Sequence, residues 1–170
     1  MKESGMVPMN FMIGSGASYH TSSLVRRKKL YDNQPNYAKG VKGVGDYPLR
    51  VYLALNGGVY YLNSIMSVYR YRAKGSWSTR NHFDKQLAIS THEALNHMLQ
   101  MADEASGYQY HDYFCEAENE QELMVLDAKG HYREMLKVEY RRAFARFSIR
   151  KRCRIFISAV IPFAAKALDR

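Results

Sequence analysis

The stretch from Gly43 to Ser78 constrains the fold most. It contains one acidic residue, then a helical pattern, and then two short apolar runs. Within Tyr47–Asn56, leucines and valines recur four positions apart, which is the spacing of one helix face. A pair of glycines follows and provides the backbone freedom that ends a helix. Val59–Leu62 and Met66–Tyr71 are rich in β-branched and aromatic residues, so we expect two strands. A further strand is expected over residues 17–25, upstream of this stretch.

Asp46 stands at the junction between the loop and the predicted helix. One interpretation is an N-cap, an acid that accepts hydrogen bonds from the first free backbone N–H groups of the helix. The other is a general base, since a helix N-terminus is a rigid mount for a carboxylate. The spacing alone is compatible with both interpretations.

Five segments follow one another in the order found in a known enzyme family. They are His20–Arg27, Gly45–Leu49 (G-D-Y-P-L), Ala54–Leu62, Met66–Arg70 (M-S-V-Y-R) and Gly75–Ser78 (G-S-W-S). Together they resemble the second half of bacterial family 2 glycosyltransferases, which are inverting enzymes with a GT-A fold. The resemblance covers residues 11–80 and gives little information on the sugar.

The resemblance implies an α/β fold, namely the acceptor-side half of a GT-A domain in residues 1–78. It also implies transfer of a sugar from a nucleotide-sugar to a glycan or lipid-linked acceptor in surface polysaccharide synthesis, with Asp46 as the catalytic base. No D-x-D motif occurs in the sequence. We therefore expect a fragment or a truncated gene product, in which a divalent metal (Mg or Mn) would be held only by the full-length enzyme. The alternative is a non-catalytic remnant that binds a glycan, a membrane or a partner.

The segment after the second predicted strand combines cations and hydroxyls with the single tryptophan. Arginine and lysine suit diphosphate oxygens, and an aromatic face packs on a sugar ring. The candidate substrate-binding residues are Arg70, Arg72, Lys74, Ser76 and Trp77. Relatives commonly have histidine at the position of Arg72, so a histidine's role is not carried over. Trp77 is also compatible with plain packing.

Residues 79–147 are predicted to form an α-helical appendage. Apolar residues at helical spacing indicate helices over 79–104, 108–126 and 131–147. His92 and His97 are five positions apart, which places them about 140° from each other on a helix, so we expect no zinc site there. The predicted site therefore includes no metal ligand.

The charges are segregated along the chain. Residues 103–127 hold eight acids and no Lys or Arg, whereas residues 137–154 hold eight Lys or Arg and one acid. The acidic helix could therefore neutralise a basic one. The acidic block and the lack of a recognised motif argue against nucleic acid as a partner. The run Arg26–Lys29 is interpreted as a solvated helix start.

Residues 148–170 are predicted to form a basic amphipathic segment. Cations at Arg146, Arg150, Lys151, Arg152 and Arg154 adjoin an apolar run that begins at Ile155. Such a helix suits an anionic membrane surface, and a docked helix with a solvated basic side is the alternative. No apolar run reaches 18 residues, and two distant cysteines fit a reducing cytoplasm, so we expect a cytoplasmic protein with peripheral contact at the inner face of the cell membrane.

Overall fold

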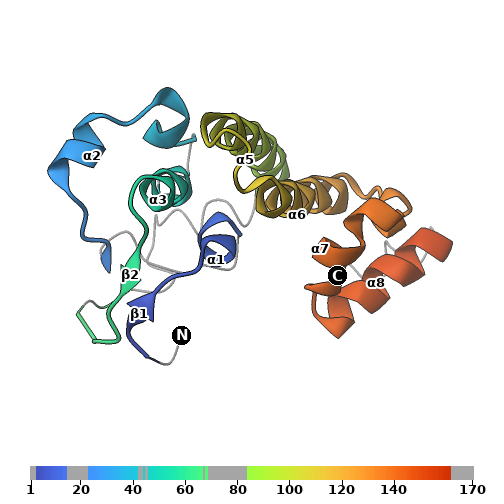
Figure 1. The fold of residues 1–170 in the computed structure, drawn as a ribbon. Helices are drawn as coiled ribbons and strands as arrows, with labels where there is room; N and C mark the ends of the chain where they lie inside the picture. The colour runs from blue at the N-terminus through green and yellow to red at the C-terminus, as the bar shows by residue number, and fades with distance from the viewer. Residues whose placement is uncertain are drawn as a thin grey trace.

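The chain is mostly helical in a computed structural model that describes residues 3–14, 23–41, 44, 46–66, 68 and 84–161. The N-terminal elements lie at one end, two long helices lie in the middle, and the C-terminal helices lie at the other end (Figure 1). The expected α/β fold is wrong, because the strands of the described residues form one two-stranded sheet and helices bury most of the apolar side chains.

The N-terminal part is built from short elements around one helix. They are β1 (Gly5–Met6), α1 (Met9–Ile13), α2 (Lys28–Asp32), the 3-10 helix η2 (Asn36–Lys39), α3 (Asp46–Leu55) and β2 (Tyr60–Tyr61). β2 pairs antiparallel with β1, with Met6 opposite Tyr60. The predicted strand over 59–62 is therefore shorter than expected, and its partner comes from the start of the chain.

The other two predicted strands fall largely outside the described residues. Of the run predicted over 17–25, only Ser23–Val25 is described, and it is not a strand. Of the run over 66–71, only Met66 and Val68 are described, and neither is in a strand. Within the described residues, the runs over 17–25 and 66–71 therefore add no strand to the two-stranded sheet of β1 and β2.

α3 confirms the predicted helix, and its burial explains its apolar sequence. Every residue from Tyr47 to Ala54 is buried. The hydroxyl of Tyr47 donates a hydrogen bond to the carbonyl of Ile13, and the buried guanidinium of Arg50 donates to the carbonyls of Met12 and Gly14. These bonds satisfy free carbonyls at the end of α1 and hold it against α3.

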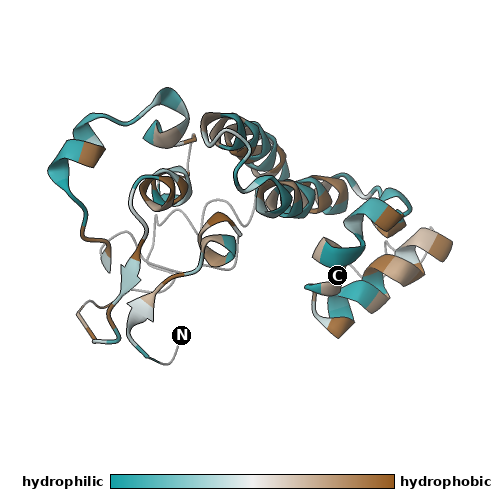
Figure 2. Cartoon of the chain, in the orientation of Figure 1, coloured by the Kyte–Doolittle hydropathy of each residue, from teal (hydrophilic) through white to brown (hydrophobic). Residues whose placement is uncertain are grey.

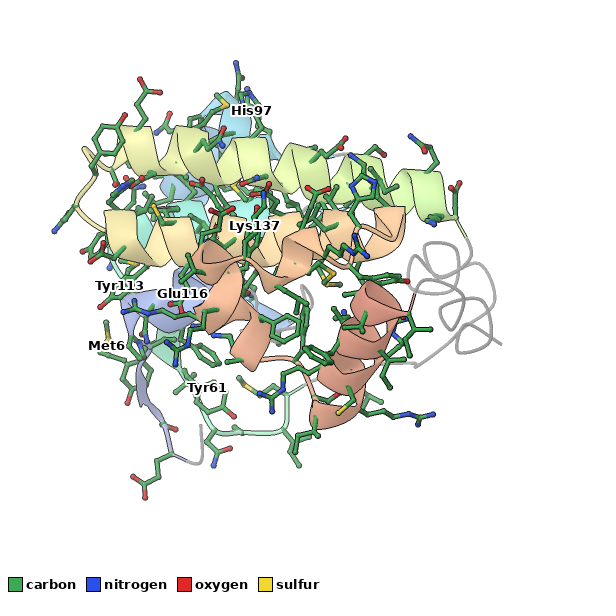
Figure 3. All side chains as sticks on the ribbon, turned by 90° about the vertical axis from the view of Figure 1, so that its right-hand side faces the viewer. Met6, Tyr61, His97, Tyr113, Glu116 and Lys137 are labelled. Atoms are coloured by element: carbon green, nitrogen blue, oxygen red, sulfur yellow. The ribbon has the colours of Figure 1, made fainter. Side chains whose placement is uncertain are left out.

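α5 (Lys85–Ala105) and α6 (His111–Lys129) form a helical hairpin, and Figure 3 shows them side by side. The Asp84 carboxylate caps α5 by accepting a hydrogen bond from the N–H of Leu87 at 2.9 Å. The shared core contains residues of both helices and of the N-terminal part: Ile13, Tyr47, Val51, Leu95, Met98, Leu99, Ala102, Phe114 and Ala117. This core spans the predicted boundary between residues 78 and 79.

The C-terminal part consists of short helices that pack on the end of α6. They are η3 (Glu134–Leu136), η4 (Val138–Tyr140), α7 (Arg141–Ala145) and α8 (Ile149–Val160). The single helix predicted over 131–147 is therefore wrong: Lys137 takes an extended backbone (φ −63°, ψ 151°) between η3 and η4. Ile155 of α8 packs with Leu123, Leu126 and Met135 in a second core cluster.

Candidate functional site

Asp46 lies in the first turn of α3, where both interpretations of the sequence place it. The residue is half-buried, and its Oδ1 accepts a hydrogen bond from the N–H of Tyr47 at 3.0 Å. The carboxylate thus lies at the N-terminal end of α3, where the helix dipole favours a negative charge. The role of general base stays a prediction.

The predicted substrate-binding residues Arg70, Arg72, Lys74, Ser76 and Trp77 lie outside the described residues. Asp46 is therefore the one predicted site residue that the structure describes. No group of three or more His, Cys, Asp or Glu side chains in the described part of the chain could hold a metal ion. The divalent metal that the resemblance implies thus has no ligand set among the described residues.

A pocket of about 610 Å³ lies at the other end of α3. Its walls come from residues 23–30, from the C-terminal end of α3 and from the chain through β2 to Met66. α3 has 10 residues and so a length of about 15 Å, and Asp46 at its start does not line the pocket. The hollow and the predicted base are therefore separate features.

The pocket lining is mainly apolar and carries two positive charges. It comprises Ser23, Leu24, Val25, Arg26, Arg27, Leu30, Leu53, Asn56, Gly57, Gly58, Val59, Tyr60, Tyr61, Leu62, Ser64, Ile65 and Met66. None of these residues is acidic. Lys28 lies in the first turn of α2, as expected for the solvated helix start predicted over Arg26–Lys29. That prediction did not include the pocket that Arg26 and Arg27 line.

The outer side of α8 carries an exposed apolar surface, which we call the α8 apolar face. It consists of Ile149, Phe156, Ile157, Val160 and Ile161, with exposed fractions between 40% and 72%. Residues 149, 156 and 160 are seven and four positions apart, so they lie along one side of the helix. Ile155 and Ala159 point to the core instead, and Figure 2 shows hydrophobic and hydrophilic residues interspersed along α8.

Three of the five cations predicted to face a membrane are engaged by acids of α6. Arg146 forms ion pairs with Glu116 (2.9 Å; labelled in Figure 3) and with Glu120. Asp127 forms ion pairs with Lys151 at 2.9 Å and with Arg154 at 2.7 Å. The acidic helix therefore neutralises part of the basic segment, as the segregated charges allowed.

Arg150 and Arg152 differ from those three cations. Neither forms an ion pair with another residue of the described ranges. At 100° per residue, Arg150 lies on one side of the α8 apolar face and Arg152 on the other. The surface is thus an apolar stripe with a cation along each edge.

A third cluster joins the end of α5 to the start of α6. His111 Nδ1 lies 2.6 Å from a carboxylate oxygen of the buried Asp103, and Cys115 Sγ lies 3.4 Å from His111 Nε2. The hydrogen bond to Asp103 raises the pKa of His111, whereas burial and nearby carboxylates raise the pKa of the Cys115 thiol. These contacts join the C-terminal end of α5 to the first turn of α6 across the turn at Gly107 and Tyr108.

Comparison with known proteins leaves the family open. Among the described residues, no helix is long and apolar enough to cross a bilayer. No protein-family model, curated protein or solved structure matches this chain. The glycosyltransferase family therefore remains an expectation from the sequence motifs alone.

Proposed function

We propose that the chain is a binding module that docks on anionic membranes through the α8 apolar face. The observation that supports this role is the exposure of the apolar side chains: 72% for Ile149, 59% for Phe156 and 60% for Val160. These residues share one side of a helix whose other side is fixed in the core. A helix of this kind lies in the plane of a membrane with its apolar side at the headgroup boundary.

The two edge cations provide the charge attraction. Arg150 can reach lipid phosphates while its aliphatic stem stays beside the apolar stripe. Arg152 adds its charge at the other edge, although its Nε is buried against the protein. Each cation near an anionic leaflet contributes on the order of 1 kcal/mol. The electrostatic contribution thus comes from fewer cations than the sequence predicted, because Arg146, Lys151 and Arg154 form ion pairs with α6.

Sedimentation with vesicles of phosphatidylglycerol and phosphatidylcholine tests this role. We expect binding that weakens as salt rises, because exposed charges are screened within about 10 Å at 0.1 M salt. Phe156→Ser should weaken binding about tenfold, since it removes an aromatic group that would enter the interface. The matched control is Val138→Ser, an 83% exposed apolar residue outside α8, which should bind like the unaltered chain.

Two further charge variants separate the edge cations from the overall charge. Arg150→Gln with Arg152→Gln should weaken binding roughly tenfold. Lys29→Gln with Lys39→Gln makes the same change in net charge on exposed residues of α2 and η2 and should have little effect. Equal losses in both pairs, or no sedimentation at low salt, would contradict the proposal. If the unaltered chain is a dimer and Phe156→Ser is a monomer, the α8 apolar face binds a second copy of the chain and not a membrane.

A second proposal retains the glycosyltransferase role, with this chain as one part of a longer enzyme and Asp46 as its general base. It is supported by the place of Asp46 in the first turn of α3, with its side chain only half-buried. In that enzyme, Asp46→Asn should lower the transfer rate about 10²–10⁴-fold, the usual loss for a general base, while the helix stays capped. Unchanged turnover in the Asn variant would select the capping role alone.

A further inference from the structure

We infer that the pocket beside α3 binds an anionic amphiphile, with the apolar body between α2 and β2 and a phosphate or carboxylate head on Arg26 and Arg27. This site is independent of membrane docking, because none of its lining residues belongs to α8. Its volume of about 610 Å³ is within the range of pockets that enclose small organic ligands.

The inner wall of the pocket belongs to the core. Leu53 is buried, and it packs with Leu49 and Tyr52 in a cluster that Leu24 and Leu30 extend. Four of these five residues are apolar aliphatic side chains, and three of them, Leu24, Leu30 and Leu53, also line the pocket. An apolar ligand body would therefore meet a preformed apolar surface.

The outer rim consists of apolar side chains that the protein itself leaves exposed. Val25 is 94% exposed and Ile65 is 97% exposed, and Leu62 and Met66 are more than half exposed. An apolar ligand body in contact with these side chains would remove water from them. Burial of that surface favours binding by about 25 cal/mol per Å².

The charge on the pocket wall selects the ligand head. The Arg26 guanidinium lies 4.2 Å from the centre of the Tyr31 ring, which holds it in place. Neither Arg26 nor Arg27 forms an ion pair within the described residues, and the nearby Asp32 is paired with Lys28. An anionic head would thus meet two cations without competition from a lining carboxylate.

The end of α3 sets the direction of the ligand. α3 ends at Leu55, and its last carbonyls carry the negative end of the helix dipole. Gly57 and Gly58 follow there, and Gly58 has a left-handed backbone (φ 73°). An anion is repelled at this wall and attracted at the arginines, so the head lies toward Arg26 and Arg27 and the apolar body lies toward Leu53.

Isothermal titration calorimetry on the full chain with decyl phosphate, below the concentration at which it forms micelles, tests this assignment. Decyl phosphate should bind at one site per chain, and decanoate should also bind because it shares the anionic head. Decanol and inorganic phosphate should each bind at least tenfold more weakly. A decanol affinity equal to that of decyl phosphate would overturn the role of the arginines, and tight inorganic phosphate alone would overturn the role of the apolar walls.

Variants place the ligand in this pocket. Arg26→Gln with Arg27→Gln should weaken decyl phosphate binding about tenfold or more, the usual loss for hydrogen bonds to a charged group. The control Lys29→Gln changes an exposed cation that does not line the pocket and should leave the affinity unchanged. Ile65→Ser should weaken binding severalfold, because it removes apolar surface at the rim.

One more variant distinguishes this site from the α8 apolar face. Phe156→Ser should leave decyl phosphate binding intact even where it abolishes binding to vesicles. Loss of decyl phosphate binding in Phe156→Ser would assign the ligand to α8 and overturn the inference. Equal losses in Lys29→Gln and in the double arginine variant would do so as well, because they would show attraction by overall charge alone.

Discussion

The chain contains two basic regions that the structure uses in opposite ways. In residues 146–154, Arg146, Lys151 and Arg154 form ion pairs with acids of α6, so these cations hold two parts of the fold together. In residues 26–29, Arg26 and Arg27 line a pocket without an acidic lining residue. Both regions are runs of positive charge in the sequence.

The difference shows that the neighbours of a cation decide its role. α6 presents Glu116, Glu120 and Asp127 along its length, and α7 and α8 pack beside it. The one acid of α2, Asp32, is used by Lys28 within the same short helix. Charge left over after such pairing is what remains available to bind an anionic ligand or surface.

The largest expected effect tests whether the core or the ion pairs hold α8 in place. Ile155 is fully buried in the second core cluster. Ile155→Ala should lower the free energy of unfolding by about 2–5 kcal/mol in urea titrations, because it leaves a cavity. The adjacent Phe156→Ala, on the exposed face, should change it by no more than about 0.5 kcal/mol. Equal losses would mean that both sides of α8 are packed.

A smaller effect is expected from the ion pairs themselves. Asp127 is 16% exposed and serves two cations, whereas Asp32 is 49% exposed and serves one. Asp127→Asn should therefore lower the free energy of unfolding by about 1–2 kcal/mol, and Asp32→Asn by at most about 0.5 kcal/mol. If the two variants lose the same stability in urea titrations, the ion pairs of Asp127 stabilise the fold no more than the exposed pair of Asp32 does.

Local periodicity was sufficient to predict the long helices. α3 and α5 agree with the helical spacing of their apolar residues, and α6 follows a turn at Gly107 and Tyr108 where both residues take positive φ. Gly107 indicated this turn in the sequence, since glycine adopts a backbone with positive φ freely. The apolar residues of each of these helices recur at helical spacing within a short stretch of sequence, so the buried face could be predicted without knowledge of its packing partners.

Tertiary packing decided the parts that the sequence did not predict. Met135 and Tyr140 are both buried in the second core cluster, yet residues five apart on one helix point about 140° from each other. The extended backbone at Lys137 lets both side chains reach the same core, and no glycine or proline marks that break. The expected α/β fold was wrong for a related reason, because the apolar residues of the N-terminal part pack mainly into helices and β2 pairs with Gly5–Met6.

The candidate site was predicted only in part. Asp46 lies in the first turn of the predicted helix, and its role as a general base stays a prediction. The pocket joins residues 23–30 to residues 53–66, and no motif within either segment indicates that they meet. The α8 apolar face could be found from the spacing of its residues, but its cations were assigned to the membrane because their partners on α6 are distant in sequence.

The smallest expected effect concerns a charge pair that pH can switch, at the turn between α5 and α6. The hydrogen bond between His111 and Asp103 raises the pKa of the histidine above its ordinary value of about 6.5, and the carboxylates of Asp112 and Glu118 add to the shift. A folded-state pKa above the unfolded value stabilises the fold fully below about pH 6.5. That stabilisation is lost as the pH rises through the pKa of the folded state.

We therefore expect the melting temperature of the unaltered chain to exceed that of His111→Gln most clearly at pH 6, with a difference that shrinks toward pH 9. The matched control is His97→Gln, which changes an exposed histidine on α5 that has no ion pair in the described part of the chain. Its difference from the unaltered chain should not change with pH in this way. A difference for His111→Gln that stays constant from pH 6 to pH 9 would mean that the histidine holds the turn as a neutral hydrogen-bond donor. The contact between His111 and the buried Asp103 would then differ from the ion pairs of α6, because a neutral histidine would contribute a hydrogen bond and no positive charge.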